Sequence, residues 1–183
     1  ADKLSRILAQ NNNTLDFGML GSKTVLRMLA KYGHANQAYE LAINEDMPSW
    51  GYWMKQGLTT LSEKWKIFNS SKDQSLNHIF MGDISAWMYN ILAGINYDEQ
   101  HPGFKHFFIQ PHFVNGLDWV DAEYNSINGL IKSSWKRNGN EITLNVIVPV
   151  NTTATIKIGS ISKELNAGNH MLTFANNKLF DKS

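Results

Sequence analysis

The sequence predicts a chain of two structural classes, with about five helices first and an antiparallel β-sandwich after them. Three observations support this prediction. The 183 residues are 43% hydrophobic and 18% charged, which is typical of a globular protein with a sizeable core. Over roughly the first hundred residues, apolar side chains recur at helical spacing. After Pro102 they alternate with a period of two, as in strands that bury one face.

The helical part is predicted from five segments with short loops between them. The clearest is Gly82–Ala93, whose buried face is predicted to contain Ile84, Trp87, Met88, Ile91 and Leu92. The other segments lie around Leu4–Leu8, from Gly18 and Gly21 to Gly33, over Ala35–Ile43 and from Pro48 to Gln56. Such short connections favour helical hairpins. About five helices cannot bury all their apolar faces when the sandwich covers one side only. We therefore expect the chain to be a fragment or one piece of a larger assembly.

The second part predicts about six or seven short strands, which is typical of a sandwich. They are placed at Phe104–Gln110, Trp119–Ser126, Leu130–Arg137, Glu141–Val148, Thr153–Ile158 and Met171–Phe174. Asn128-Gly129 and Asn138-Gly139 predict hairpins whose two turn residues both have positive φ. We therefore expect a helical domain over residues 1–103 and a β-sandwich over residues 104–183.

The composition excludes several classes of function. With a net charge of +1 and no basic cluster, a nucleic-acid partner is not expected. The absence of cysteine excludes disulfides, thiolate metal sites and a cysteine nucleophile. No apolar run reaches the roughly 18 residues of a membrane helix, so no membrane partner is expected. His101, His106 and His112 have a spacing that fits no compact ligand set, so we expect neither a metal nor another cofactor.

Several strings occur in order along most of the chain. They are DMPSWGY at Asp46–Tyr52, GLTTLSEKW at Gly57–Trp65, SLNH at Ser75–His78 with the segment that follows to Ile95, PGFKH at Pro102–His106, and the hairpin residues Gly129–Ile131 with Ser134 and Trp135. Together they resemble the α-L-rhamnosidases of glycoside hydrolase family 78.

The resemblance implies a fold and an activity. The fold is the C-terminal half of an (α/α)6 barrel followed by a C-terminal β-sandwich, and the activity is hydrolysis of terminal α-L-rhamnosyl residues with inversion. The implied partners are a rhamnose-containing glycan or glycoside and the upstream half of the same enzyme. A periplasmic or secreted bacterial location is favoured over a cytoplasmic one.

The resemblance also implies roles for four residues. Glu63 matches the general base, and it lies between Leu61 and Trp65 in a segment where a carboxylate is poorly solvated. His78 matches a histidine that hydrogen-bonds a rhamnose hydroxyl. Trp50 and Trp65 are candidates for a wall on which the sugar stacks, and one of the two is expected to touch it. The general acid is expected in the missing upstream half, so the chain alone should be inactive.

Other interpretations of these residues stay open. Glu63 is also compatible with a surface glutamate paired with Lys64 or Lys66. Ser62 replaces a tryptophan of the family, and the loop Lys66–Gln74 is short. Both departures are placed at the rim of the expected pocket, so another (α/α)6 glycosidase with a different sugar remains possible.

A different class of function is a non-catalytic carbohydrate-binding or structural sandwich. That function requires exposed aromatic side chains on a strand face, whereas the apolar neighbours of Trp119 and Trp135 favour burial. Asp16, Asp46 and Asp83 are interpreted as helix caps.

Overall fold

The computed structural model describes residues 1–15, 17–67, 74–175 and 178–180. It divides into two compact units, Ala1–Trp87 and Met88–Ser183. Helices form the first unit and strands dominate the second, which confirms the predicted fold class. The boundary that the sequence placed at residue 103 is later than this division of the structure. The difference includes strand β1 (Ile95–Tyr97), which pairs with β2 (His106–Ile109) in the second unit. A strand of three residues is too short for its periodicity to be recognised.

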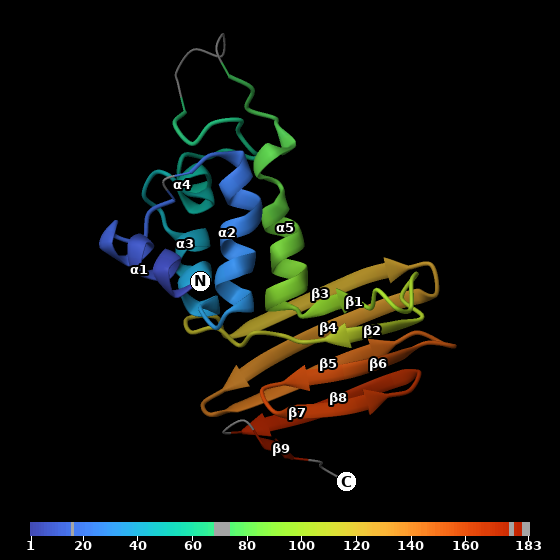
Figure 1. Ribbon diagram of the computed structural model, residues 1–183. Coiled ribbons are helices and arrows are strands. Elements are labelled where there is room, and N and C mark those ends of the chain that lie inside the picture. Colours follow the sequence, from blue (N-terminus) through green and yellow to red (C-terminus); the bar gives the residue numbers. More distant parts are fainter. Residues whose placement is uncertain (16, 68–73, 176–177, 181–183) are drawn as a thin grey trace. The chain divides into compact units, whose positions relative to one another are not determined.

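The helical unit follows the predicted segments closely (Figure 1). Its elements are α1 (Asp2–Gln10), α2 (Met19–Lys31), α3 (Ala35–Ile43), α4 (Trp50–Lys55), the 3₁₀ turn η1 (Ile79–Met81) and α5 (Asp83–Trp87). Helix α2 packs against both α3 and α5. None of the helices in the described ranges has the length and apolar character needed to cross a membrane.

An ion pair connects α2 to α5. Arg27 Nη2 donates to Asp83 Oδ1 at 3.0 Å, and Arg27 Nε lies 3.0 Å from Asp83 Oδ2. Asp83 is the first residue inside α5 and not the residue before the helix, so it does not occupy the cap position that the sequence suggested, and its carboxylate is engaged by Arg27. Asp16, the other candidate cap near α2, lies outside the described residues.

The buried face predicted for Gly82–Ala93 is only partly confirmed. Ile84, Trp87 and Leu92 are buried, but Met88 is 45% exposed. The chain leaves α-helical geometry at Met88 and enters the π-helix η2 (Met88–Leu92), in which the wider turn changes the direction of successive side chains.

The second unit is a sandwich of two sheets. One has the strand order β1-β2-β6-β7 and the other β3-β4-β5-β8-β9. The remaining strands are β3 (Trp119–Ser126), β4 (Gly129–Asn138), β5 (Glu141–Val148), β6 (Thr153–Ile158), β7 (Ile161–Leu165), β8 (Gly168–Ala175) and β9 (Lys178–Phe180). Neighbouring strands are antiparallel except β2 and β6, whose parallel pairing the sequence did not predict.

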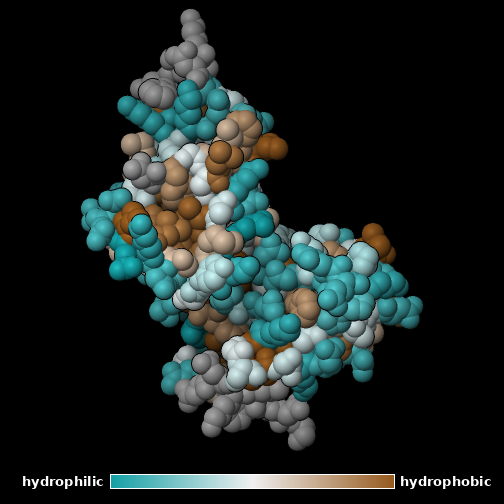
Figure 2. All heavy atoms as spheres, in the orientation of Figure 1, coloured by the Kyte–Doolittle hydropathy of each residue, from teal (hydrophilic) through white to brown (hydrophobic). Residues whose placement is uncertain are grey.

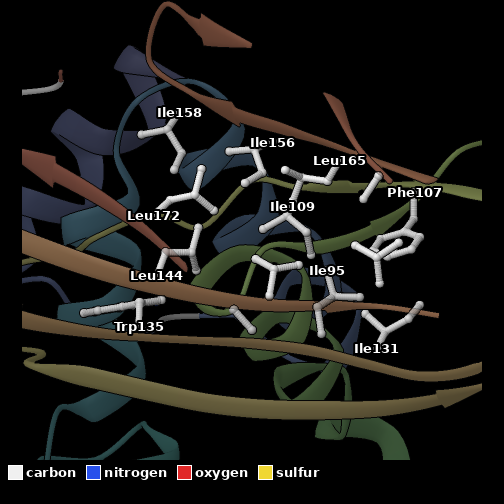
Figure 3. Close-up of a cluster of buried hydrophobic side chains, with 14 of the residues drawn as sticks. Ile95, Phe107, Ile109, Ile131, Trp135, Leu144, Ile156, Ile158, Leu165 and Leu172 are labelled. Atoms are coloured by element: carbon white, nitrogen blue, oxygen red, sulfur yellow. The ribbon is translucent and has the colours of Figure 1, made fainter. Parts of the chain in front are cut away.

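The core of the sandwich lies between the sheets (Figure 3). Ile109 and Ile156 from one sheet face Leu144 and Leu172 from the other, and all four are at most 4% exposed. Complete burial of one such side chain contributes about 1.5–3 kcal/mol. The alternation predicted for Glu141–Val148 is confirmed, because Ile142, Leu144, Val146 and Val148 are all buried.

Both Asn-Gly pairs lie at hairpins, as predicted, but with different turn geometry. Ser126 pairs with Gly129, and Gly129 has a φ of 120° whereas Asn128 is not left-handed. In the second hairpin Gly139 has a φ of 59°, while Asn138 belongs to strand β4. Asn128 is held by local contacts instead, since its backbone N–H donates to Ser126 Oγ at 3.1 Å.

Candidate active site

Two neighbouring segments of the helical unit hold the residues that the sequence singled out. The N–H of Glu63 donates to Ser75 O at 2.9 Å, and the N–H of Ser75 donates to Glu63 Oε2 at 3.1 Å. The N–H of His78 donates to Leu61 O at 2.8 Å. Glu63 and His78 therefore lie on two adjacent segments of irregular structure that these three hydrogen bonds connect.

The carboxylate of Glu63 is half-buried and oriented. Its Oε2 accepts a hydrogen bond from a backbone amide, and such a bond to a charged group is stronger than a neutral one. The bond directs the side chain along the neighbouring segment. A fixed carboxylate of this kind suits the abstraction of a proton from a bound water molecule.

Ser62, which precedes the candidate base, does not lie at a pocket rim. It is completely buried, and its Oγ accepts from Gln74 Nε2 at 3.4 Å and from the N–H of Lys64 at 3.4 Å. The expectation of a rim position is therefore wrong for Ser62. Its side chain points into the unit, so its effect on a sugar is indirect.

His78 begins the turn η1 and keeps one ring nitrogen available. Its Nδ1 accepts from the N–H of Phe80 at 3.2 Å, so the ring hydrogen of a neutral His78 resides on Nε2. The ring packs on Phe80 with 3.7 Å between centroids. The capping role considered for His78 is present, and it uses Nδ1 of the ring.

The two candidate tryptophans have different surroundings. Trp50 is 6% exposed and donates from Nε1 to Met81 O at 3.0 Å. Trp65 is half-buried and donates from Nε1 to Phe17 O at 2.7 Å. Their rings meet edge to face at 5.1 Å. Of the two, Trp65 has the accessible surface that stacking requires, and Trp50 supports it from the interior.

Trp53 completes this aromatic cluster and was not predicted. Its ring lies 4.8 Å from that of Trp65 at 32°, and its Nε1 donates to Trp65 O at 2.9 Å. The spacing of Trp50 and Trp53 on one helix face was the available signal. The cluster fixes the direction of the Trp65 ring.

The turn before α4 places Trp50. Ser49 is the N-cap, and its Oγ accepts from the N–H of Tyr52 at 2.9 Å. The prediction that Asp46 caps this helix is wrong, because Ser49 occupies the N-cap position and Asp46 lies three residues before it. A Cβ on Gly51 would lie 2.3 Å from Asn44 O, which explains the glycine after the tryptophan.

In the sandwich, the two tryptophans considered for sugar binding differ from expectation. Trp135 is 2% exposed and belongs to the core, as predicted. Trp119 is 63% exposed, so the predicted burial of Trp119 is wrong. It borders an open hollow of about 360 Å³ with Asp121, Lys136 and Asn145. Trp119 begins strand β3, where the outward side of the sheet faces solvent.

A group of metal-ligand type also occurs in the sandwich. Asp98, His101 and His106 bring one ligand atom each to within 4.8 Å of the others. The group does not contain His112, the pKa of which is lowered by burial. The sequence missed the group because the histidines alone have no compact spacing, and Asp98 was not considered with them.

Comparison with known proteins identifies the family. The model of the bacterial alpha-L-rhamnosidase 6 hairpin glycosidase domain matches residues 1–92, half of the chain. The chain belongs to the bacterial α-L-rhamnosidase six-hairpin glycosidase family. The model of the bacterial alpha-L-rhamnosidase C-terminal domain matches residues 94–172 of the same chain. The resemblance found in the sequence is thereby confirmed.

Individual relatives agree with this assignment. An alpha-L-rhamnosidase of Formosa agariphila is 35% identical over 163 residues, and one of Streptomyces avermitilis is 30% identical over 164 residues. The crystal structure of the Streptomyces avermitilis enzyme complexed with L-rhamnose matches 94% of this chain with a TM-score of 0.86 and 26% identity. The alpha-L-rhamnosidase structure from Dictyoglumus thermophilum matches the fold with a TM-score of 0.86 at 24% identity.

The chain corresponds to a small part of these relatives. The matches cover 86% of this chain but only 17% of the Formosa agariphila protein and 16% of the Streptomyces avermitilis protein. The chain therefore spans about one sixth of the length of these relatives.

Proposed function

We propose that the chain is the C-terminal portion of an inverting α-L-rhamnosidase and that Glu63 is its general base. The observation that supports this most directly is the hydrogen bond from the N–H of Ser75 to Glu63 Oε2, because it holds a half-buried carboxylate in one direction next to the segment of His78. His78 Nε2–H binds a hydroxyl of the rhamnosyl ring, and the exposed part of Trp65 packs on its C–H face.

The proposed reaction needs two carboxyl groups about 6.5–9.5 Å apart. Glu63 takes a proton from a water molecule, whose oxygen forms a bond to the anomeric carbon. The bond from that carbon to the leaving oxygen breaks on the opposite face, and a carboxylic acid in the upstream half gives that oxygen its proton. Attack from the face opposite the leaving group inverts the anomeric configuration.

Exposed apolar side chains on the helical unit support the requirement for an upstream half. Leu20 is 80% exposed, Met54 77% and Ile79 83%. In Figure 2 such hydrophobic residues reach the surface of this unit as brown patches. Large exposed apolar areas commonly mark contact surfaces. The remaining helices of a closed barrel would cover them.

The proposal predicts that hydrolysis needs both halves. The purified 183-residue chain should not release nitrophenol from 4-nitrophenyl α-L-rhamnoside. A chimera in which this chain replaces the matching segment of the Formosa agariphila rhamnosidase should release it. Proton NMR of the fresh product should show β-L-rhamnose first, since inversion produces that anomer.

Two results would contradict this prediction. Turnover by the chain alone would show that the upstream acid is not needed. Formation of α-L-rhamnose as the first product would show retention, which a water-activating base at Glu63 does not explain. For a folded but inactive chimera, saturation-transfer NMR of the 183-residue chain with rhamnose gives an independent measurement, and the absence of binding would also count against the proposal.

The exposed ring of Trp119 favours a second candidate function, glycan binding by the sandwich. An indole beside the polar side chains of Asp121, Lys136 and Asn145 combines a stacking face with hydrogen-bonding groups, as sugar sites require. This function is compatible with catalysis by the other unit.

The second candidate predicts a selective effect of Trp119→Ala. In affinity electrophoresis through rhamnose-containing polysaccharide gels, the variant of the full chain should lose retardation because the stacking face is removed. Hydrolysis of the small nitrophenyl substrate by the corresponding chimera should stay unchanged. Equal retardation of both forms would exclude a glycan site at Trp119, and Met171→Ala, which removes another exposed side chain of the same sheet, is the matched control.

A further inference from the structure

The β1–β2 connection brings two histidines onto one carboxylate. His101 Nδ1 lies 2.8 Å and His106 Nδ1 2.9 Å from Asp98 Oδ2. Asp98 directly follows β1 and His106 begins β2, and the pairing of Tyr97 with Phe107 places them beside each other. The pairing of β1 with β2 thus sets the positions of Asp98 and His106.

A second set of contacts fixes the ring of His106. The hydroxyl of Thr155 donates its single hydrogen to Glu164 Oε1. Thr155 Oγ1 must therefore accept from His106 Nε2, which lies 2.8 Å away. Because the hydrogen of a neutral His106 is then on Nε2, its Nδ1 presents a lone pair to the carboxylate of Asp98.

A lone pair and an ionised carboxylate at 2.9 Å repel each other unless a positive charge lies between them. The carboxylate of Asp98 is surrounded by nitrogen atoms, since His101 Nδ1 lies 2.8 Å from its Oδ2 and the N–H of Gln100 donates to its Oδ1 at 3.0 Å. Two kinds of positive charge satisfy the arrangement: a second proton on His106, or a metal ion bound by all three side chains.

We infer that Asp98, His101 and His106 form a binding site for one zinc ion. Imidazole nitrogen and carboxylate oxygen are ligands that Zn²⁺ prefers, and the mixture of nitrogen and oxygen disfavours Ca²⁺ and Mg²⁺. Tetrahedral ligand atoms about 2.0–2.2 Å from a zinc ion lie about 3.3–3.6 Å apart. Asp98 Oδ2, now 2.8 and 2.9 Å from the two Nδ1 atoms, would therefore move slightly away from them on binding. His101 is 55% exposed, which allows its ring to turn inward on binding.

The contacts behind His106 match those of known zinc sites. A zinc-bound histidine commonly donates its other ring N–H to an oxygen, which fixes the tautomer and the ring orientation. The hydrogen bonds from His106 Nε2 to Thr155 and from Thr155 to Glu164 provide this arrangement. The side chains of Asp98 and His106 are only 13% and 15% exposed. The bound ion would join the β1–β2 connection to the sheet edge. The inference does not depend on glycoside hydrolysis.

The test uses the full 183-residue chain, freed of metal by a chelating resin and carrying no histidine tag. Isothermal titration with ZnCl₂ should show one ion per chain, and the Tm should rise with zinc concentration because only the folded chain has the site. Thr155→Val should weaken zinc binding by about 10- to 100-fold although it removes no ligand. His101→Ala, at an exposed position, should weaken it by at least about tenfold as well.

His34→Ala is the matched control, because His34 Nε2 also lies 2.8 Å from a carboxylate, that of Asp2, in the helical unit. This variant should bind zinc as the parent chain does. An adventitious ion only, with equal affinity in His101→Ala and the parent, would overturn the inference. So would ¹⁵N NMR that shows both His106 ring nitrogens protonated and unchanged by zinc, since the proton would then be the positive charge.

Discussion

Replacing Glu63 by glutamine is expected to lower kcat of the chimeric rhamnosidase by about 10²–10⁴-fold, the usual contribution of a general base. Glutamine keeps an oxygen that accepts from the N–H of Ser75, so the local structure should persist. It cannot take a proton from water at neutral pH. KM for 4-nitrophenyl α-L-rhamnoside should change little, because the amide occupies the same place. Steady-state kinetics with circular dichroism as a folding check measures both effects.

The matched control for Glu63→Gln is Glu40→Gln, which makes the same chemical change at an exposed position of α3. Its kcat should equal that of the parent chimera. Glu63→Ala gives a further readout that a structural role would not produce. Azide is already an anion, so it can attack the anomeric carbon without a base, and we expect β-L-rhamnosyl azide from this variant. A folded Glu63→Gln chimera with parental kcat would exclude the base role.

The sequence predicted best those features that repeat along the chain. The period of two over Glu141–Val148 and the helical spacing over Ala35–Ile43 each extend over enough residues to define a buried face, and both segments have the predicted bounds. The strand Ile95–Tyr97 and the parallel pairing of β2 with β6 depend on partners far along the chain. No local pattern encodes such pairings.

The candidate site could be predicted only in part, because some of its contacts also depend on partners far along the chain. Motif strings identified Glu63 and His78, but their side-chain contacts were not predictable from the motifs. The inward direction of Ser62 depends on Gln74, twelve residues later. The group around Asp98 depends on strand pairing that places it beside His106. Interactions made through tertiary structure were therefore the part that the sequence did not show.

Replacing Trp135 by alanine is expected to lower the free energy of unfolding of the sandwich by about 3–5 kcal/mol, as for other large aromatic side chains deleted from a core. Trp135 is 2% exposed and meets the ring of Phe113 edge to face at 5.1 Å. Its Nε1 donates to Leu92 O at 2.8 Å. Trp135→Phe keeps an aromatic ring and removes this hydrogen bond, so it should cost about 1–3 kcal/mol.

Two compact units need not unfold in one transition, so the measurement must report on the sandwich itself. Hydrogen exchange of the β4 and β5 amides in increasing urea does so, because these strands lie inside the sheet. Trp119→Ala is the matched control, since it deletes the same side chain at a 63% exposed position and should change stability by no more than about 0.5 kcal/mol. Equal effects of the two substitutions would mean that the contacts of Trp135 with Leu92 and Phe113 do not stabilise the core. A large difference would show that these contacts, which join the end of η2 to strand β4, hold the sandwich together.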